Sequence, residues 1–238
     1  MNIILKKKKT LYFFSIITIV AICMMEPFFI VNDKTYSFID TIKKIPPSEY
    51  SRFCIQDVFS FGSSSLWLYL IMPVVVATPL ASYISDEQKS MFHLYEKMRQ
   101  GTPRYFGFRL FYSLMSSGII VFIGLGIYLL VVCCYFDLYK VYPGGVMDIG
   151  GEGQGISELV RYFTVKFGYL VVYSFSISLL ASFLVLLYND LYFDLSVTFM
   201  LNYLFKDWFL KNNILYPLII AAVLIILFMI KWKRGRKI

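Results

Sequence analysis

Histidine is almost absent from this sequence, since His93 is the only one. Zinc enzymes hold their metal with several protein ligands, and those of the HExxH type use two histidines on one helix. The chain contains neither that pattern, nor the GxxxxGK(S/T) sequence that cradles nucleotide phosphates, nor the GxSxG turn of hydrolases. We therefore expect that the chain is not an enzyme by itself and binds no cofactor of its own.

Cysteine is also scarce, with four residues, Cys23, Cys54, Cys133 and Cys134. Their spacing fits neither a paired metal-ligand motif nor a disulfide framework. Cys133 and Cys134 are adjacent at the end of an apolar run, where cysteine serves as a small packing residue. The cysteines therefore indicate no metal site.

Acidic residues are few as well, because 15 Asp and Glu stand against 23 Lys and Arg, which gives a formal net charge of +8. In a soluble protein this balance would suggest nucleic acid as a partner. The chain, however, is 58% hydrophobic with a mean hydropathy of +0.67, whereas soluble domains are about 45–50% apolar. We therefore expect membrane lipid and not nucleic acid, with basic residues holding cytoplasmic loops at an anionic membrane face.

Long apolar runs predict an all-α, polytopic membrane protein with one transmembrane domain over residues 1–238. A membrane-spanning helix needs about 20 mostly apolar residues. Six candidates lie at about residues 10–31, 64–84, 108–134, 163–188, 191–205 and 214–230. The fifth is short and contains Asp194 and Asn202, so we expect it to be tilted, broken or buried. The first follows a lysine run as in a signal peptide, but no cleavage site follows Met25, and we interpret it as a retained span.

The distribution of Lys and Arg predicts the orientation. Both ends of the chain are strongly basic, at residues 6–9 and 231–237, and basic segments stay on the cytoplasmic side. Both termini are therefore expected inside, which requires an even number of spans. This is the main reason to keep the weak fifth span against the rival count of five. Two loops, at residues 32–63 and 135–162, then lie outside. The second is rich in glycine, but residues 144–155 contain no lysine and follow no strand pattern, so we interpret it as a flexible loop and not a phosphate site.

Small and polar residues recur inside the predicted spans. Pro73 and Pro79 interrupt the second span, and each removes a backbone hydrogen bond that neighbouring helices can replace. Serines recur along the third and fourth spans, which suits either close helix packing or a polar translocation path. The residues that would line such a path are Glu26, Tyr69, Ser116, Tyr173 and Ser178. Glu26 is an acid inside a predicted span and hence a candidate by default, with packing or snorkelling as the alternative.

A charged segment between the second and third spans predicts an amphipathic helix at about residues 85–100. Ser85 and Gln88 form a capping box, and Asp86 and Glu87 suit the first turn. An apolar stripe follows at helical spacing, made of Met91, Leu94, Tyr95 and Met98. Gly101 and Pro103 end the helix. Such a helix lies along the cytoplasmic face against lipid, the bundle or a partner.

The stretches MPVVVATPLASYISDEQKSMF at 72–92 and MRQGTPRYFGFRL at 98–110 resemble the type-2 ABC exporter permeases, particularly the small six-span permeases of Gram-positive bacteria. Asp86–Glu87 match an acidic pair that follows a proline-containing second span. Arg99, Arg104, Tyr105 and Arg109 match the basic turn and the start of the third span. One departure is Ser90–Met91, where a glycine often follows the acidic pair.

This resemblance implies a multi-pass subunit of the bacterial plasma membrane whose amphipathic helix is a coupling helix. The helix would dock on a cytoplasmic ABC ATPase subunit, which supplies ATP and Mg, through Asp86, Glu87, Met91, Tyr95, Arg99 and Arg104. The short inside loop with Asp190 and Asp194 would be a second contact. A second permease, in a homodimer or heterodimer, would complete the pathway for an unidentified peptide, lipid or drug-like cargo.

Two alternatives remain open. A non-transporting immunity or sensor-accessory membrane protein would have the same spans and would work without an ATPase. A membrane enzyme acting on lipid would need clustered acids or histidines. Asp190 and Asp194 are four residues apart and are the nearest approach to an acid–base pair, but we prefer a polar loop or a partner contact as their role.

Overall fold

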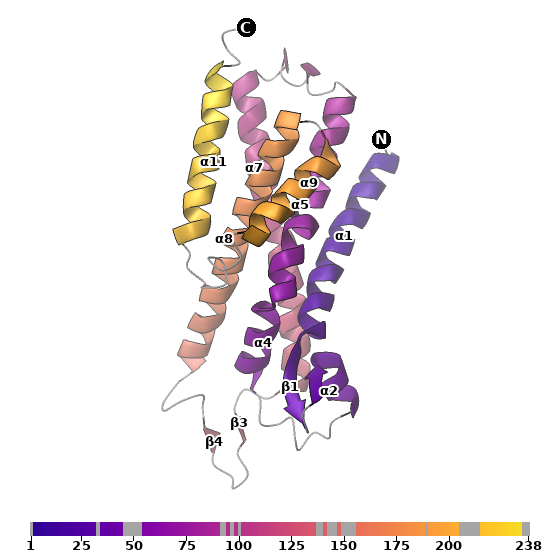
Figure 1. The fold of residues 1–238 in the computed structure, drawn as a ribbon, viewed down its shortest axis with the longest axis vertical. Helices are drawn as coiled ribbons and strands as arrows, with labels where there is room; N and C mark the ends of the chain where they lie inside the picture. Colours follow the sequence, from indigo (N-terminus) through magenta and orange to yellow (C-terminus); the bar gives the residue numbers. More distant parts are fainter. Residues whose placement is uncertain are drawn as a thin grey trace. The chain divides into compact units, whose positions relative to one another are not determined.

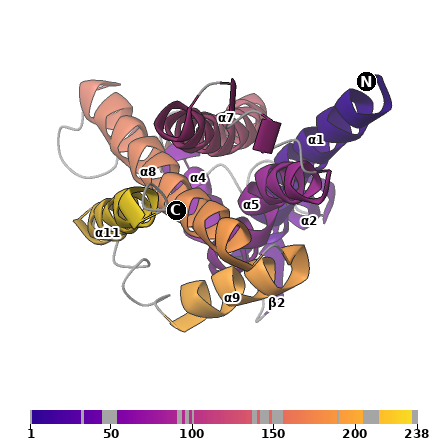
Figure 2. The same ribbon diagram turned by 90° about the horizontal axis from the view of Figure 1, so that it is seen from above.

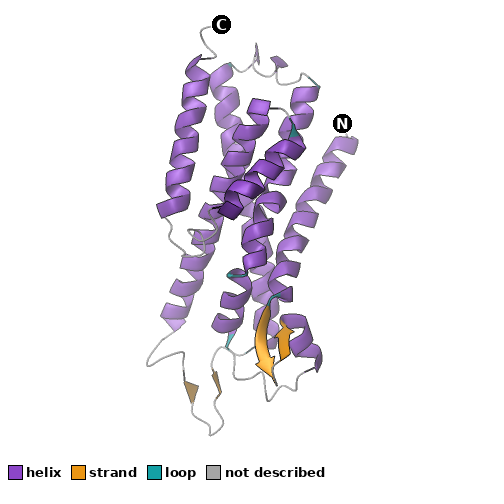
Figure 3. Ribbon diagram, in the orientation of Figure 1, coloured by secondary structure: helices purple, strands orange, loops and turns teal. Residues whose placement is uncertain are grey.

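The computed structural model describes residues 2–31, 34–44, 54–90, 94–95, 98–99, 101–136, 140–141, 147–148, 156–188, 190–204 and 215–234. Over these residues the chain is mostly helical, with eight helices and two small antiparallel sheets (Figures 1 and 3). The helical fold predicted from the apolar runs is thereby confirmed, and the two small sheets are additions to it.

The packing divides the chain into two compact units. Unit 1 comprises Met1–Ile16, Tyr69–Val121 and Tyr169–Ile238, and unit 2 comprises Ile17–Leu68 and Phe122–Gly168. Four long helices contribute residues to both units, namely α1 (Asn2–Met25), α5 (Leu66–Lys89), α7 (Thr102–Tyr135) and α8 (Ile156–Tyr188). Unit 1 also contains α9 (Leu191–Leu204) and α11 (Leu215–Arg234), and unit 2 contains the remaining described elements.

Three of these helices are long and apolar enough to cross a membrane. Their candidate spans are Leu66–Glu87 in α5, Gly107–Tyr135 in α7 and Leu159–Val185 in α8, with 22, 29 and 27 residues. They contain the predicted third span and overlap most of the predicted second and fourth spans. At about 1.5 Å per residue, even the shortest covers the roughly 30 Å hydrocarbon core of a bilayer.

The other three predicted spans correspond to α1, α9 and α11, whose apolar stretches are shorter where side chains are described. Those stretches are Lys9–Met25 in α1 and Pro217–Leu227 in α11, and α9 has 14 residues. The bounds of α9 agree closely with the predicted fifth segment. Among the described residues, three helices and not six have the length and composition of a full span.

The first helix ends six residues before the end of the predicted first span at residue 31. The helix α1 ends at Met25, and the next residues form β1 (Pro27–Val31), which pairs antiparallel with β2 (Lys34–Ser37). Proline disfavours the helical conformation at the residue before it, and the Phe, Ile and Val that follow favour extended backbone. Pro27 therefore turns the chain from helix to strand.

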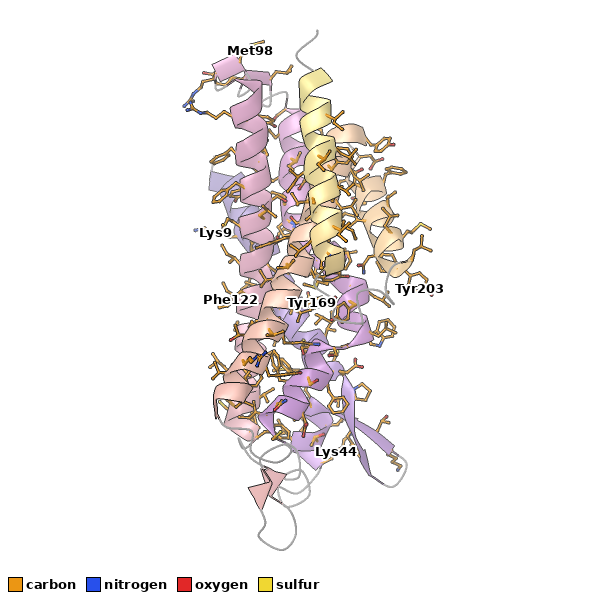
Figure 4. The ribbon with its side chains drawn as sticks, turned by 90° about the vertical axis from the view of Figure 1, so that its left-hand side faces the viewer. Lys9, Lys44, Met98, Phe122, Tyr169 and Tyr203 are labelled. Carbon is orange, nitrogen blue, oxygen red and sulfur yellow. The ribbon has the colours of Figure 1, made fainter. Side chains whose placement is uncertain are left out.

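Where the structure describes the predicted outer loop at residues 32–63, it shows regular elements that belong to unit 2. Two helices, α2 (Phe38–Lys44) and α4 (Ile55–Ser63), follow the β1–β2 hairpin, and Lys44 marks the end of α2 in Figure 4. Ser37 caps α2, because its hydroxyl accepts from the backbone N–H of Asp40 at 3.3 Å and donates to the Asp40 carboxylate at 3.1 Å.

An aromatic cluster forms the centre of unit 2. The Phe59 ring stacks on Tyr128 at 5.8 Å and on Phe167 at 5.5 Å, measured between ring centroids. The Tyr128 hydroxyl donates to the Val58 carbonyl at 2.9 Å. Gly62 is required there, because an added Cβ would lie 2.3 Å from the Tyr128 hydroxyl oxygen. Aromatic burial of this kind fixes α4 against α7 and α8.

Two prolines inside α5 each free a backbone carbonyl in unit 1. Pro73 has no N–H for the carbonyl of Tyr69, and Pro79 has none for that of Val75, four residues earlier in each case. The side-chain amide of Asn202 in α9 donates to the Tyr69 carbonyl at 2.6 Å, and the Ser15 hydroxyl in α1 donates to the Val75 carbonyl at 2.8 Å. Neighbouring helices therefore replace both missing hydrogen bonds, as predicted.

Serine hydroxyls connect α7 and α8 within unit 1. The Ser113 hydroxyl lies 2.7 Å from that of Ser178 and 2.9 Å from that of Ser182. An apolar cluster of Leu80, Ala81, Ile84 and Val185 packs beside them, and Leu191 and Leu195 of α9 lie against it. Figure 2 shows α9 beside α8 when the ribbon is seen from above.

The predicted glycine-rich loop at residues 135–162 is shorter in the structure, because α7 ends at Tyr135 and α8 begins at Ile156. Between these helices the structure describes a pair of two-residue strands. These strands, β3 (Lys140–Val141) and β4 (Met147–Asp148), pair antiparallel. The rest of residues 142–155 lies outside the described residues.

Candidate functional site

We name residues 90–101, between α5 and α7, the connector. The structure describes Leu94, Tyr95, Met98 and Arg99 in it as helical, and Met91 lies outside the described residues. Leu94 is 43% exposed, Tyr95 61% and Met98 85%. Met98 is labelled in Figure 4. These three residues therefore form apolar surface on the connector.

The connector ends where the sequence predicts. Gly101 has a φ of 80°, a left-handed conformation that glycine adopts without steric cost and that commonly ends helices. The next helix, α7, begins directly at Thr102, with Pro103 in its first turn. Proline is tolerated there because first-turn N–H groups have no partner within the helix.

The start of the predicted amphipathic helix is different. Residues 85–89 continue α5 to Lys89, so Ser85 lies inside a helix and the predicted capping box is wrong. Its hydroxyl is buried and has no hydrogen-bond partner. The apolar face of α5 continues through Ile84 into the core of unit 1, and this packing, with the backbone hydrogen bonds of the added helical turn, outweighs the local capping preference.

A buried ion pair connects the end of α5 to the start of α7. The Arg109 guanidinium donates to the Glu87 carboxylate, and the two side chains are only 9% and 3% exposed. The Tyr105 hydroxyl donates to the same carboxylate at 3.4 Å. The guanidinium carbon lies 4.6 Å from the centre of the Tyr83 ring and 5.3 Å from that of Tyr105, so two aromatic faces also stabilise the cation.

This buried group holds both ends of the connector. Burial and the adjacent Glu87 carboxylate raise the pKa of Tyr105, which keeps its hydroxyl protonated as a donor. Removing one partner of a buried ion pair typically costs about 3–5 kcal/mol, because the other charge is left uncompensated. We name Glu87, Arg109, Tyr105 and Tyr83 the clasp. The clasp fixes the two helix ends from which the connector projects.

The predicted ATPase contacts fall into two groups. Asp86, Tyr95, Arg99 and Arg104 are exposed, but Glu87 is buried in the clasp. Its carboxylate already has two donors within the chain, so Glu87 has a different environment from its neighbour Asp86. The exposed residues add charge of both signs beside the apolar surface of the connector.

Asp190 and Asp194, the predicted second contact, do not share a face. Asp190 is exposed, and its carboxylate accepts from the backbone N–H groups of Tyr192 at 3.0 Å and Phe193 at 3.3 Å, which makes it the N-cap of α9. Asp194 is completely buried, and neither carboxylate oxygen has a hydrogen-bond partner. The two acids are therefore not arranged as an acid–base pair.

The predicted pathway residues are packed within their own units. In unit 1, Tyr69, Ser116, Tyr173 and Ser178 are at most 5% exposed. The Tyr173 hydroxyl donates to the side-chain oxygen of Asn202. In unit 2, the Glu26 carboxylate accepts from the Ser65 hydroxyl at 2.5 Å. For each of these residues the contacts are those expected for the helix-packing alternative.

Sequence reasoning named Glu87, Tyr105 and Arg109 but did not predict that they contact one another. Glu87 and Arg109 are 22 positions apart, and no local pattern indicates that they meet. The partner of Pro73 had a usable signal, because a proline frees a carbonyl inside a span and Asn202 is a polar residue in another. No group of three or more metal-ligating side chains occurs within the described residues.

Comparison with known proteins adds no relative. No family model, no curated protein and no solved structure matches this chain.

Proposed function

We propose that this chain is the membrane-spanning permease subunit of an ATP-driven exporter. A separate cytoplasmic ATPase would bind the connector, and its ATP cycle would drive export of a peptide, lipid or drug-like cargo. The observation that carries this proposal is the exposure of the apolar side chains of Leu94, Tyr95 and Met98. These residues lie between two candidate spans whose ends are joined by a buried ion pair.

The connector has the properties of a docking element for a soluble partner. Apolar surface left in water costs about 25 cal/mol per Å², so covering these three side chains favours association. The exposed charges of Asp86, Arg99 and Arg104 would select the partner and its orientation more than they add affinity. A partner with an apolar cleft edged by charges of both signs fits this surface.

The clasp gives such docking a mechanical consequence. Glu87 is in the last turns of α5 and Arg109 is in the second turn of α7. A displacement of the connector would therefore reach both helices through the clasp. Conformational coupling requires discrete packed contacts of this kind. ATP and Mg belong to the partner, because the sequence of this chain has no nucleotide-binding motif.

Export requires a pathway, which we propose forms between two permease chains. Polar side chains of α7, α8 and α9 in unit 1, among them Ser113, Tyr173 and Asn202, are hydrogen-bonded inside the unit. A second copy or a related permease would supply the other wall. The proposed placement is the bacterial plasma membrane, with both termini in the cytoplasm.

The experiment is affinity purification of the tagged chain in mild detergent, with identification of co-purifying ATPases and measurement of ATP hydrolysis. Tyr95→Asp and Met98→Asp should abolish recruitment of the ATPase, because each places a charge on the exposed apolar surface of the connector. Ile39→Asp is the matched control, since Ile39 is 37% exposed on α2 in the loop predicted outside. Wild-type recruitment in both connector variants would contradict the proposal.

The proposed orientation has its own test. Lys43 in α2 and Lys89 at the end of α5 are predicted on opposite sides. With Cys133 and Cys134 replaced by serine, Lys43→Cys should react with an impermeant maleimide in intact cells. Lys89→Cys should react only after permeabilisation. The reverse pattern would overturn the orientation without affecting the docking test.

A further inference from the structure

A cavity of about 130 Å³ lies among α8, α9 and α11 in unit 1. Three of the residues around it are polar, Ser176, Thr198 and Asn202, yet only apolar atoms face the cavity. The remaining wall is formed by Ile177, Leu180, Leu201 and Ile220. A wall that contains polar residues but presents no polar surface needs an explanation.

The explanation is that each polar group is already bonded elsewhere. The Ser176 hydroxyl donates to the Pro217 carbonyl at 2.6 Å, and the Thr198 hydroxyl donates to the Asp194 carbonyl at 2.7 Å. Asn202 uses both ends of its amide, one on the Tyr69 carbonyl and the other on the Tyr173 hydroxyl. A water molecule in a cavity needs two to four polar partners. The polar groups of these three residues are bonded to other protein atoms and do not face the cavity.

The size of the cavity restricts the occupant further. Apolar protein cavities of about 150 Å³ stay dry and bind small hydrocarbons such as benzene. The cavity here is of that order, large enough for a short run of methylene groups but not for a whole peptide or drug. It therefore suits the end of a hydrocarbon chain whose remainder lies outside.

The outer faces of the same helices indicate where that chain comes from. Next to Ile220, Leu218 is 47% exposed and Ile219 58%, and on α9 Met200 is 64% exposed. In a membrane, lipid chains cover such apolar faces. We propose that the cavity is a binding site for one acyl chain of a membrane lipid, inserted between α8, α9 and α11.

An acyl chain there would support the packing that holds α9. The polar residues that border the cavity also hold the helices around it. The hydroxyl of Ser176 bonds to α11, that of Thr198 bonds within α9, and the amide of Asn202 bonds to α5. Filling the space restores the dispersion contacts that an empty cavity lacks. The inference rests on the membrane location and not on an ATPase, so it stands or fails independently of the docking proposal.

The test uses purified protein in phosphatidylcholine vesicles that contain a phosphatidylcholine with a diazirine on one acyl chain. After irradiation, peptide mass spectrometry locates the adducts. Ile177 is the diagnostic position, because it is only 5% exposed and lines the cavity. Ile219, on the outer face of α11, reports ordinary lipid contact.

Two substitutions of opposite effect and one control decide the outcome. Ile220→Phe fills the cavity and should lower the Ile177 adduct several-fold, whereas Ile220→Ala enlarges the cavity and should raise it. Ile219→Phe, the same change at the adjacent exposed residue, should leave the adduct unchanged. A wild-type Ile177 adduct no stronger than that at Leu170, which is buried away from the cavity, would overturn the proposal. An Ile177 adduct that neither Ile220 variant changes would also overturn it.

Discussion

The side-chain amide of Asn202 donates to the carbonyl of Tyr69 at 2.6 Å, the group that Pro73 leaves without its helical partner. The two residues belong to α9 and α5, and 133 positions separate them. The carbonyl that Pro73 frees in α5 thus accepts a hydrogen bond that holds α9 against α5. This contact explains how a short helix with an internal amide is held in unit 1.

The first prediction is that the cost of losing Asn202 depends on Pro73. Asn202→Leu should lower the free energy of unfolding by about 1–3 kcal/mol, because it leaves the Tyr69 carbonyl buried and unpaired. In a Pro73→Ala background the new N–H restores the helical bond, and the same substitution should cost less. Thermal unfolding of the four proteins in detergent measures the coupling. Equal costs in both backgrounds would contradict the account.

The second prediction concerns the clasp. Glu87→Ala should lower stability by about 3–5 kcal/mol, because Arg109 is left as a buried charge without its partner. The double variant Glu87→Leu with Arg109→Leu should recover most of that loss, since apolar residues can replace a buried ion pair. Asp86→Ala, at an exposed neighbouring acid, is the control and should change the melting temperature little. A double variant as unstable as Glu87→Ala would show that the pair is not the cause.

The third prediction is that two acids four residues apart have opposite effects. Asp194→Leu should raise stability by about 1–3 kcal/mol, because it removes a buried carboxylate without hydrogen-bond partners. Asp190→Leu should lower stability by about 0.5–2 kcal/mol, because it removes the N-cap of α9. Both are read from chemical denaturation of the purified protein. Destabilisation by Asp194→Leu would show that the carboxylate has an essential partner.

The fourth prediction is a pH dependence in α2. Hydrogen bonds from Lys44 and Ser37 lower the pKa of Asp40, so its carboxylate binds protons less readily in the folded helix. The stabilisation is therefore complete above the ordinary aspartate pKa of about 3.9 and is lost as pH falls through the lowered value. Amide protection in α2, which is the ratio of the intrinsic exchange rate to the observed rate at the same pH, should decrease over that acid range. Asp40→Asn should remove the dependence, and its persistence in that variant would assign it to another group.

Sequence reasoning predicted the helices whose signals are local. The bounds of α9 agree with the predicted fifth segment almost completely, and the positive φ of Gly101 ends the connector as expected. Apolar periodicity, glycine and proline carry such information within a few residues. The N-cap role of Asp190 was equally readable, because an aspartate directly precedes the apolar helix.

The errors arose where distant packing decides. Ser85 fits a capping box by sequence, but the core around Ile84 extends α5 past it to Lys89. The first span was predicted through Val31 because hydropathy alone does not distinguish an apolar strand from a helix, and Pro27 changes the conformation there. The Glu87–Arg109 pair depends on how two helices meet, which no window of sequence contains.

Site-specific photocrosslinking from the connector in living cells tests the central claim most directly. A photoreactive phenylalanine analogue would replace Tyr95, which is 61% exposed, and mass spectrometry would identify the cross-linked protein. The account predicts an adduct with a nucleotide-binding ATPase that is absent when the analogue replaces Phe61, 47% exposed on α4. Adducts with lipid alone, or the same adduct from both positions, would contradict the claim that the connector docks an ATPase.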